Sequence, residues 1–291
     1  MTWQTILQLL FSGLALGAVY GLVALSYSTI YATRNIINFG QGELVVLGSL
    51  LGVSLVVVAK VPVFIALMAS AGVVAVAALL FEWLAVRPVK DVGRNMIWVM
   101  STFGLGIVFN QVMQKLWGTS PVRFPKFIGT DEPIQWGQVT MLPQEIGVIV
   151  IAVAVAVLFE LFRRNTLLGK AVRATAMDRD TASLMGIDTR KVVYGSYALS
   201  GALATLCGFL VAPIQFADPN GGVMLSVKGF IALVIGGLGS PIGGFLGGLF
   251  LGLLEIGSAS LISEVWKDVI TFGALILVLL VRPSGFFGRL G

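Results

Sequence analysis

The sequence predicts an all-α fold in which residues 1–291 form a single polytopic membrane domain with about eight to nine transmembrane or re-entrant helices. Two observations support this prediction. Only 11% of the 291 residues are charged and 57% are hydrophobic, whereas soluble domains carry roughly 25% charged residues. Apolar runs of about 18 or more residues also recur along the chain, and a helix of that length crosses the hydrocarbon core of a bilayer.

Hydropathy places the expected helices in order along the chain. Eight spans are expected at 5–31, 42–59, 62–86, 95–117, 144–162, 192–212, 240–262 and 265–281, with a shorter candidate at 224–238. Pro62, Pro143 and Pro241 fall at or near span edges, where a missing backbone donor does least harm. The shorter segment either crosses fully or makes one neighbour re-entrant, and the sequence leaves both counts open.

Lysine and arginine gather in short loops, and this distribution sets the expected orientation. The basic connection at about 163–191 and the C-terminus, with Arg282 and Arg289, are expected in the cytosol, and the connection at about 118–143 is expected outside. The net charge of +5 is thus divided among loops instead of forming one continuous patch. This distribution argues against a nucleic-acid partner.

Composition excludes several catalytic and metal sites. The chain has no histidine and a single cysteine, Cys207, which removes Ser–His and Cys–His pairs, HExxH zinc sites and histidine proton relays. The only Gly-Lys pair, Gly169-Lys170, has Arg164 where a GxxxxGK phosphate loop needs its first glycine. The sequence therefore assigns this chain no catalytic residue, no metal and no cofactor.

A short charged segment, LGKAVRATAMDRDTASLMGIDTRKV from Leu168 to Val192, interrupts the apolar runs. Its composition favours a helix from about Lys170 to Met185 that ends at Gly186. The positions that share its apolar face are Ala174, Met177, Thr181, Leu184 and Met185. The segment could be a solvated connector, an interfacial helix on anionic lipid, or a docking element for a cytosolic partner.

Glycines recur at four-residue spacing in two spans. Gly13, Gly17 and Gly21 form one ladder on the first span, and a second ladder near the end of the chain consists of Gly244, Gly248 and Gly252. In lipid, small residues at this spacing let helix backbones approach closely. The ladders therefore predict helix packing, either within the chain or against a second membrane subunit.

Ionisable and polar side chains inside spans are functional hypotheses because burying them in lipid is costly. Lys228 and Glu255 each lie in an apolar run, and the pair could be a structural ion pair or a gate, or Lys228 could snorkel to the interface. A second group, Asn35, Asn38, Gln41 and Glu43, gathers at the entry to the second span. It could line an aqueous path through a broken helix or form an ordinary loop.

Several motifs resemble those of a known transporter family. In DTASLMG, from Asp180 to Gly186, the spacing is similar to the E-A-A-x-x-x-G pattern in cytosolic loops of ABC importer permeases. NIINFGQGELVVLG, LAVRPVK, KGFIALVIGGLGSPIGGFLGG and VRPSGFFG resemble, in this order, the branched-chain amino acid permeases of the LivH type. The resemblance covers essentially the whole chain. Members often carry Ala-His where this chain has Gly40-Gln41.

The resemblance implies the permease subunit of an ABC importer in the bacterial inner membrane, translocating branched-chain or other small hydrophobic amino acids. The implied partners are a homologous second permease subunit, two cytosolic ABC ATPase subunits that hold ATP and magnesium, and a periplasmic substrate-binding protein that the 118–143 loop could contact. The charged segment would be a coupling helix that contacts the ATPase through Arg173, Asp178, Asp180, Thr181, Ala182, Met185 and Gly186.

Three other functions are weighed against this one. The cargo could be urea, a short amide or another small organic solute, because related permeases carry these. The protein could also be a stand-alone secondary transporter. Strong inverted repeats would favour that function, and none is visible in the sequence. An intramembrane enzyme would need a histidine, a carboxylate pair or a metal-ligand cluster, which the sequence does not provide.

Overall fold

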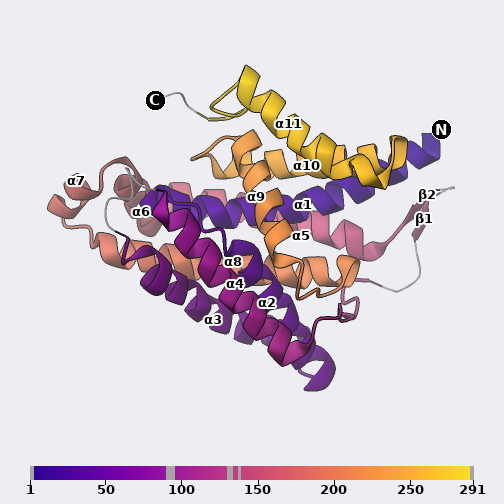
Figure 1. Ribbon diagram of the computed structural model, residues 1–291, viewed down its shortest axis with the longest axis horizontal. Helices are drawn as coiled ribbons and strands as arrows, with labels where there is room; N and C mark the ends of the chain where they lie inside the picture. The colour runs from indigo at the N-terminus through magenta and orange to yellow at the C-terminus, as the bar shows by residue number, and fades with distance from the viewer. Residues whose placement is uncertain (1–2, 90–95, 130–133, 137–138, 289–291) are drawn as a thin grey trace. The chain divides into compact units, whose positions relative to one another are not determined.

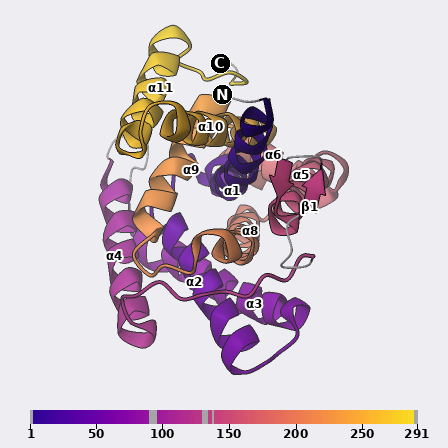
Figure 2. The same ribbon diagram turned by 90° about the vertical axis from the view of Figure 1, so that its right-hand side faces the viewer.

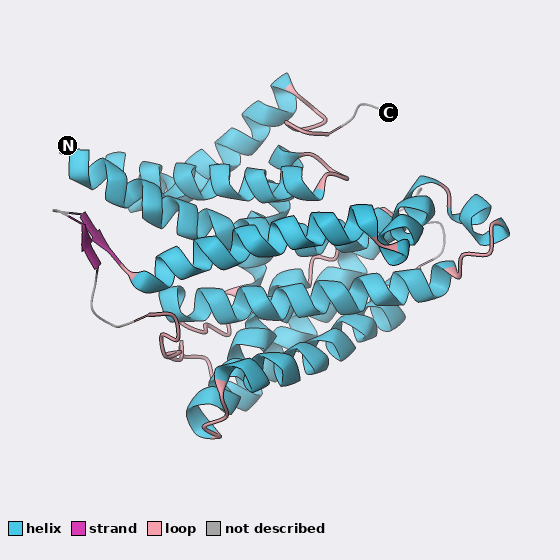
Figure 3. Cartoon of the chain, turned by 180° about the vertical axis from the view of Figure 1, so that it is seen from behind, coloured by secondary structure: helices cyan, strands magenta, loops and turns pink. Residues whose placement is uncertain are grey.

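The chain folds almost entirely into helices, as Figure 3 shows. The computed structural model describes residues 3–89, 96–129, 134–136 and 139–288. Within these residues, six helical segments are long and apolar enough to cross a membrane, by length and composition: Thr5–Arg34, Gln41–Val58, Val63–Val86, Pro143–Asn165, Thr189–Gln215 and Pro241–Leu261. A predominantly helical, multi-span protein is therefore confirmed at this level.

The elements follow the predicted order (Figure 1). The helices of the six segments are α1 (Trp3–Arg34), α2 (Gln41–Val53), α3 (Val63–Phe81), α5 (Pro143–Asn165), α8 (Thr189–Gln215) and α10 (Pro241–Leu261). Two π-helical turns extend these helices: η1 (Ser54–Val58) follows α2, and η2 (Glu82–Val86) follows α3. The remaining helices are α4 (Ile97–Trp117), α6 (Leu167–Met177), α7 (Arg179–Leu184), α9 (Gly222–Gly236), the 3₁₀ turn η3 (Glu264–Trp266) and α11 (Lys267–Val281).

Prolines and serines mark where helices begin. Pro62 is the N-cap residue of α3, and Pro143 is the first residue of α5. Pro241 is the first residue of α10, where the Ser240 side chain accepts a hydrogen bond from the Gly243 N–H. Proline suits these positions because the first helical N–H groups have no partner within the helix.

A small β-hairpin is present where the sequence predicted only a loop. Strand β1 (Ile134–Trp136) pairs antiparallel with β2 (Val139–Met141), with Gln135 opposite Thr140. Branched and aromatic residues such as Ile134, Trp136 and Val139 favour extended backbone. Within the expected 118–143 loop, residues 130–133 and 137–138 lie outside the residues that the structure describes.

The charged segment after α5 forms two helices, although the sequence predicted one from Lys170 to Met185. Helix α6 ends at Met177, and Asp178 adopts an extended conformation with φ −155° and ψ 113°. The Asp178 side chain then accepts hydrogen bonds from the N–H groups of Asp180 and Thr181, so it caps α7. Aspartate competes with the helical backbone in this way, which is why it favours helix starts over helix interiors.

The chain divides into two compact units. Unit 1 comprises Met1–Leu25, Pro125–Ala156 and Lys228–Gly291, and unit 2 comprises Ser26–Phe124 and Val157–Val227. Within unit 1, α1 and α10 lie side by side (Figure 2), and the two glycine ladders face each other. A Cβ atom added at Gly248 would overlap the backbone of Gly21, and one added at Gly252 would overlap that of Gly17.

The other two ladder glycines extend the same close approach. A Cβ atom at Gly13 would meet Leu253, and one at Gly244 would meet Leu233 and Ala24. All six ladder glycines therefore pack within the chain, where the backbones of α1 and α10 come closer than larger side chains would allow.

Unit 2 is built around α2, α3 and α8. Glycines again allow close approach: Gly48 of α2 lies against Thr205 of α8, Gly208 of α8 lies against Val45 of α2, and Gly201 of α8 lies against the backbone of α3 at Val74. Eleven of the thirteen residues of α2 are buried. A helix that is enclosed on nearly all sides holds its polar side chains in fixed surroundings, and α2 carries two such side chains at its start, Gln41 and Glu43.

Candidate functional site

Polar residues at the start of α2 are buried and bonded within unit 2. The Asn38 Oδ1 atom accepts a hydrogen bond from the Gly40 N–H at 3.1 Å, and Gln41 Nε2 donates to the Ser200 carbonyl at 3.3 Å. Asn35, in contrast, is exposed and has a φ of +53°, which ends α1. Thus three of the four predicted polar residues, Asn38, Gln41 and Glu43, are buried, and Asn35 marks the turn before them.

Glu43 is held by a helix that the sequence did not associate with it. Its Oε2 atom accepts a hydrogen bond from Asn110 Nδ2 of α4 at 3.3 Å, and the same Nδ2 donates to the Pro219 carbonyl at 2.7 Å. The carboxylate also lies against Gly222, where an added Cβ atom would overlap it. Its second oxygen, Oε1, is buried without a hydrogen-bond partner among the residues that the structure describes.

A chain of amide hydrogen bonds leads from Glu43 to the protein surface. Asn110 Oδ1 accepts from Gln114 Nε2 at 2.6 Å, and Gln114 Nε2 also donates to Asn220 Oδ1 at 2.9 Å. Asn220 is exposed, and its Nδ2 donates to the Thr119 carbonyl at 2.9 Å. The buried carboxylate is therefore linked to solvent by a row of side-chain amides.

Asn110, Gln114 and Asn220 are not among the residues predicted from the sequence. A signal was available, because Asn110 and Gln114 lie one helical turn apart within an apolar span, where polar residues mark functional candidates. Their partners could not have been found in this way, since Asn110 and Glu43 are 67 positions apart.

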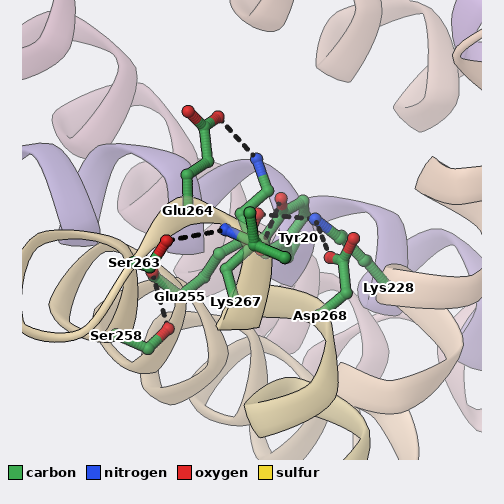
Figure 4. Close-up of polar contacts among 9 residues, drawn as sticks. Tyr20, Lys228, Glu255, Ser258, Ser263, Glu264, Lys267 and Asp268 are labelled. Atoms are coloured by element: carbon green, nitrogen blue, oxygen red, sulfur yellow. Dashed lines mark hydrogen bonds and ion pairs between the residues drawn. The ribbon is translucent and has the colours of Figure 1, made fainter.

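Unit 1 contains a buried ionic cluster around Lys228 (Figure 4). Lys228 Nζ lies 2.5 Å from Glu255 Oε1 and 3.3 Å from Asp268 Oδ1. The hydroxyl of Tyr20 donates to Glu255 Oε2 at 2.9 Å, and Lys228 Nζ is 5.6 Å from the centroid of the Tyr20 ring. The two residues that the sequence singled out are thus paired, and Tyr20 and Asp268 are additions that it missed.

The surroundings of this cluster bear on the three alternatives for Lys228. Lys228 is 7% exposed and Glu255 4%, so the ammonium group of Lys228 lies against carboxylates instead of extending to the surface. Asp268 is the more open partner, with 39% of its side chain exposed. Whether the cluster is structural or acts as a gate remains a prediction.

The α6–α7 segment presents an ordered surface in unit 2. The Thr166 side chain caps α6 by accepting from the Gly169 N–H at 3.0 Å. At the end of α7, Gly186 has a φ of +83°, its N–H donates to Ser183, and the Ile187 N–H donates to Ala182. These two hydrogen bonds form a Schellman motif, in which a glycine ends the helix. The glycine stop predicted at Gly186 is therefore confirmed.

Side chains on this segment differ sharply in exposure. Ala182 is buried, whereas Met177, Leu184 and Met185 are among the most exposed apolar residues, at 88%, 88% and 79%. Three of the predicted contact residues, Asp178, Asp180 and Thr181, are also exposed, and Arg173 donates to the Arg164 carbonyl at 3.4 Å. The Thr181 hydroxyl and backbone N–H groups lower the pKa of Asp178 below its ordinary value, because these hydrogen bonds favour the carboxylate.

No metal site accompanies these features: within the described ranges, no group of three or more aspartate, glutamate, cysteine or histidine residues lies close enough to hold an ion. The arrangement instead consists of polar and charged side chains buried among the helices, several of which are of membrane length, together with an exposed apolar surface on α6 and α7. Such an arrangement can pass or gate a solute and can contact a partner.

Comparisons with known proteins agree along the length of the chain. Residues 9–279 match the family described as branched-chain amino acid transport system / permease component. The high-affinity branched-chain amino acid transport system permease protein LivH of Escherichia coli (strain K12) is 34% identical, over 97% of this chain and 96% of that protein. BraD of Pseudomonas aeruginosa, a permease protein with the same description, is 30% identical over the same shares.

A solved structure shares the fold. A chain of PsaBC from Streptococcus pneumoniae, solved in complex with Fab, has a TM-score of 0.50 and 15% sequence identity, covering 95% of this chain and 92% of that one. This likeness bears on the fold alone. The family match and the relatives at 30% identity or more show which family the chain belongs to. This chain is a member of the branched-chain amino acid transport system permease family.

Proposed function

We propose that this chain is the membrane-spanning permease subunit of an ABC importer for branched-chain or other small hydrophobic amino acids. The observation that carries the proposal is the similarity to LivH and BraD, proteins named for high-affinity branched-chain amino acid transport, over 97% of the chain. The protein is a multi-pass membrane protein, and its place is the bacterial inner membrane.

The α6–α7 segment is the coupling helix of this importer. Its exposed apolar residues Met177, Leu184 and Met185 seat in a groove of an ATPase subunit, and its charged residues fix the register of the contact. ATP and magnesium are held by two such ATPase subunits. A homologous second permease completes the membrane part, and a periplasmic binding protein delivers the amino acid on the side of the 118–143 connection.

The translocation pathway passes the polar residues of α2 and α4. A zwitterionic cargo needs polar groups along its route, because an unsatisfied charge within the bilayer is costly. Glu43 and the amides of Asn110 and Gln114 provide such groups, and Glu43 Oε1 is an acceptor suited to an ammonium group.

Eight to nine membrane segments fit the helices of the chain. Besides the six long spans, three further helices are candidate membrane segments. Helix α4 has 21 residues, and α9 and α11 have 15 residues each. A 15-residue helix is only about 22 Å long, which is less than the roughly 30 Å of a bilayer core. Each of α9 and α11 is therefore re-entrant or extended by its flanking residues.

Reconstituted complexes test the coupling role. Leucine uptake and ATP hydrolysis are measured in vesicles with the native chain, with Leu184→Asp, and with the backbone change Gly186→Pro. We expect uptake to fall to background, accompanied either by loss of the ATPase from the complex or by hydrolysis that no longer depends on leucine and binding protein. Lys60→Asp is the control, because Lys60 is exposed and lies in the connection before α3, outside the segment.

Two results would contradict the proposal. Leucine uptake by this chain alone, insensitive to ATP and to the Leu184→Asp change, would identify a gradient-driven carrier. Uptake of urea or acetamide but not of leucine, valine or isoleucine by the full complex would keep the importer and replace the cargo.

A further inference from the structure

Unit 2 contains an arginine-rich cavity that is separate from the polar site around Glu43. It has a volume of about 210 Å³ and is lined by Arg34, Glu82, Arg87, Arg179, Arg190 and Tyr194, with Val193 beside them. Four arginines and one glutamate give the lining a formal charge of +4 − 1 = +3. Since a water occupies about 30 Å³ of liquid, the cavity has room for a small anionic group with several waters.

The inner part of this cavity is a buried ion pair. Arg34 Nη2 lies 2.6 Å from Glu82 Oε1, and the side chains are 17% and 2% exposed. This pair joins the last residue of α1 to the first residue of η2, so it fixes one wall of the cavity. Because Glu82 neutralises only Arg34, the charges of the other three arginines are not balanced by the lining.

The outer part carries three exposed arginines from three elements. Arg87 follows η2, Arg179 is the first residue of α7, and Arg190 lies in the first turn of α8. Arg190 Nε donates to the Tyr194 hydroxyl at 3.2 Å, and its guanidinium lies 5.7 Å from the centroid of that ring. This contact orients the guanidinium and uses one of its five N–H donors.

The charge and donor geometry select a phosphate group as the ligand. Guanidinium groups present planar forks of N–H donors that match phosphate oxygens, and several of them around one cavity can bind one phosphate from different sides. A carboxylate offers two acceptor oxygens, whereas a phosphate offers more, so several guanidinium groups can hold one phosphate at the same time.

The position of the cavity favours a phosphate carried by a lipid. Arg34 ends one span-length helix, Arg87 follows a second, and Arg190 lies near the start of a third, so the cavity lies at the depth where these spans leave the membrane. Basic pockets between transmembrane helices at that depth bind anionic head groups. The η2 turn that supplies Glu82 also exposes Trp83 by 55% and Leu84 by 48%, which offers apolar surface to acyl chains.

We propose that the cavity lined by Arg34, Arg87, Arg179 and Arg190 binds the phosphate of an anionic phospholipid head group. The bound lipid joins the ends of α1, α3 and α8 to the first residue of α7. Anionic lipid therefore stabilises the junction between the membrane helices and the α6–α7 segment, independently of which solute the protein carries.

Lipid binding to the purified full-length chain in detergent tests this assignment. Native mass spectrometry and thermal unfolding are followed while phosphatidylglycerol, phosphatidylcholine or inorganic phosphate is added. We expect phosphatidylglycerol to bind and to raise the unfolding temperature, and the double variant Arg87→Gln/Arg190→Gln to weaken its binding by at least about tenfold, since each basic residue near a membrane surface contributes about 1 kcal/mol. Arg282→Gln is the control, because it removes an exposed arginine outside the cavity.

Three outcomes would overturn the proposal. Equal binding of phosphatidylcholine would show that head-group charge is not recognised. Inorganic phosphate that binds as tightly as phosphatidylglycerol would assign the cavity to a free anion instead of a lipid. Lipid binding that is unchanged in the double variant, together with loss of the ATPase subunit from the complex, would assign these arginines to a protein contact.

Discussion

At the scale of single residues, Lys228 holds together the buried charges of unit 1. Its Nζ atom is 2.5 Å from Glu255 and 3.3 Å from Asp268, and Tyr20 donates to the other oxygen of Glu255. Replacing a lysine in such a place leaves a buried carboxylate without its cation. Breaking a buried pair on one side commonly costs about 3–5 kcal/mol, much more than removing both partners.

We therefore expect Lys228→Met to lower the unfolding temperature of the purified protein strongly, and Glu255→Gln to do the same. The double variant should be more stable than the sum of the single changes implies, because neither charge is then left alone. Thermal unfolding in lipid nanodiscs measures this coupling, and leucine uptake by the same variants shows whether the pair is also a gate.

The exposed pair Lys267–Glu264 provides the control for this cycle. Its atoms are 3.2 Å apart, with side chains 31% and 82% exposed. Lys267→Met should change stability by less than about 1 kcal/mol, as for most surface ion pairs. If Lys228→Met and Glu255→Gln add independently, the pair is not coupled and the cluster has no structural role.

Gly222 is a second residue whose size matters, because it lies against the carboxylate of Glu43. The added methyl of Gly222→Ala meets the flexible end of a side chain, so we expect Glu43 to turn away from Asn110 while the fold persists. Uptake should fall by roughly tenfold or more, as for the loss of one hydrogen bond to a charged group. Gly72→Ala is the control, since nothing lies near its Cβ position; unchanged uptake in Gly222→Ala would remove Glu43 from the pathway.

At the scale of elements, the two glycine ladders let α1 and α10 pack backbone to backbone. The methyl of Gly248→Ala would meet the backbone of Gly21, which cannot move as a side chain can. We expect this change to cost about 1–3 kcal/mol, as for other overpacked sites, and to lower the unfolding temperature. Gly257→Ala on the same helix is the control because nothing lies within 4 Å of its Cβ position; equal effects of both changes would mean that the close approach is unimportant.

At the scale of the whole molecule, the distribution of basic loops predicts which parts face the cytosol. Cys207 is the only cysteine and is buried, so single added cysteines can report accessibility. In intact cells, we expect a membrane-impermeant maleimide to label Ser120→Cys, between α4 and the hairpin, and not Asn165→Cys, at the end of α5. Permeabilised cells provide the control, in which both positions should react, and labelling of Asn165→Cys alone in intact cells would reverse the orientation.

Patterns along the chain were enough to predict a multi-span helical protein, the glycine that ends α7, and the family that the chain resembles. These conclusions follow from local patterns. An apolar run long enough to cross a bilayer must satisfy its own backbone hydrogen bonds, so it forms a helix, and a left-handed helix end such as Gly186, with φ +83°, favours glycine. The break at Asp178 is local too, but the helix propensity of the whole segment does not predict it, because it depends on the aspartate side chain acting as a cap.

The pairing of groups that are far apart in the sequence became visible in the folded chain alone. The ladder of α1 faces that of α10, Glu43 meets Asn110 and Gly222, and Arg34 pairs with Glu82 although Arg87 is nearer in sequence. Such partners are separated by tens to hundreds of positions, and no periodicity along the chain specifies them. They are selected when helices pack, because a buried charge or polar group is tolerated only where another part of the chain supplies its partner.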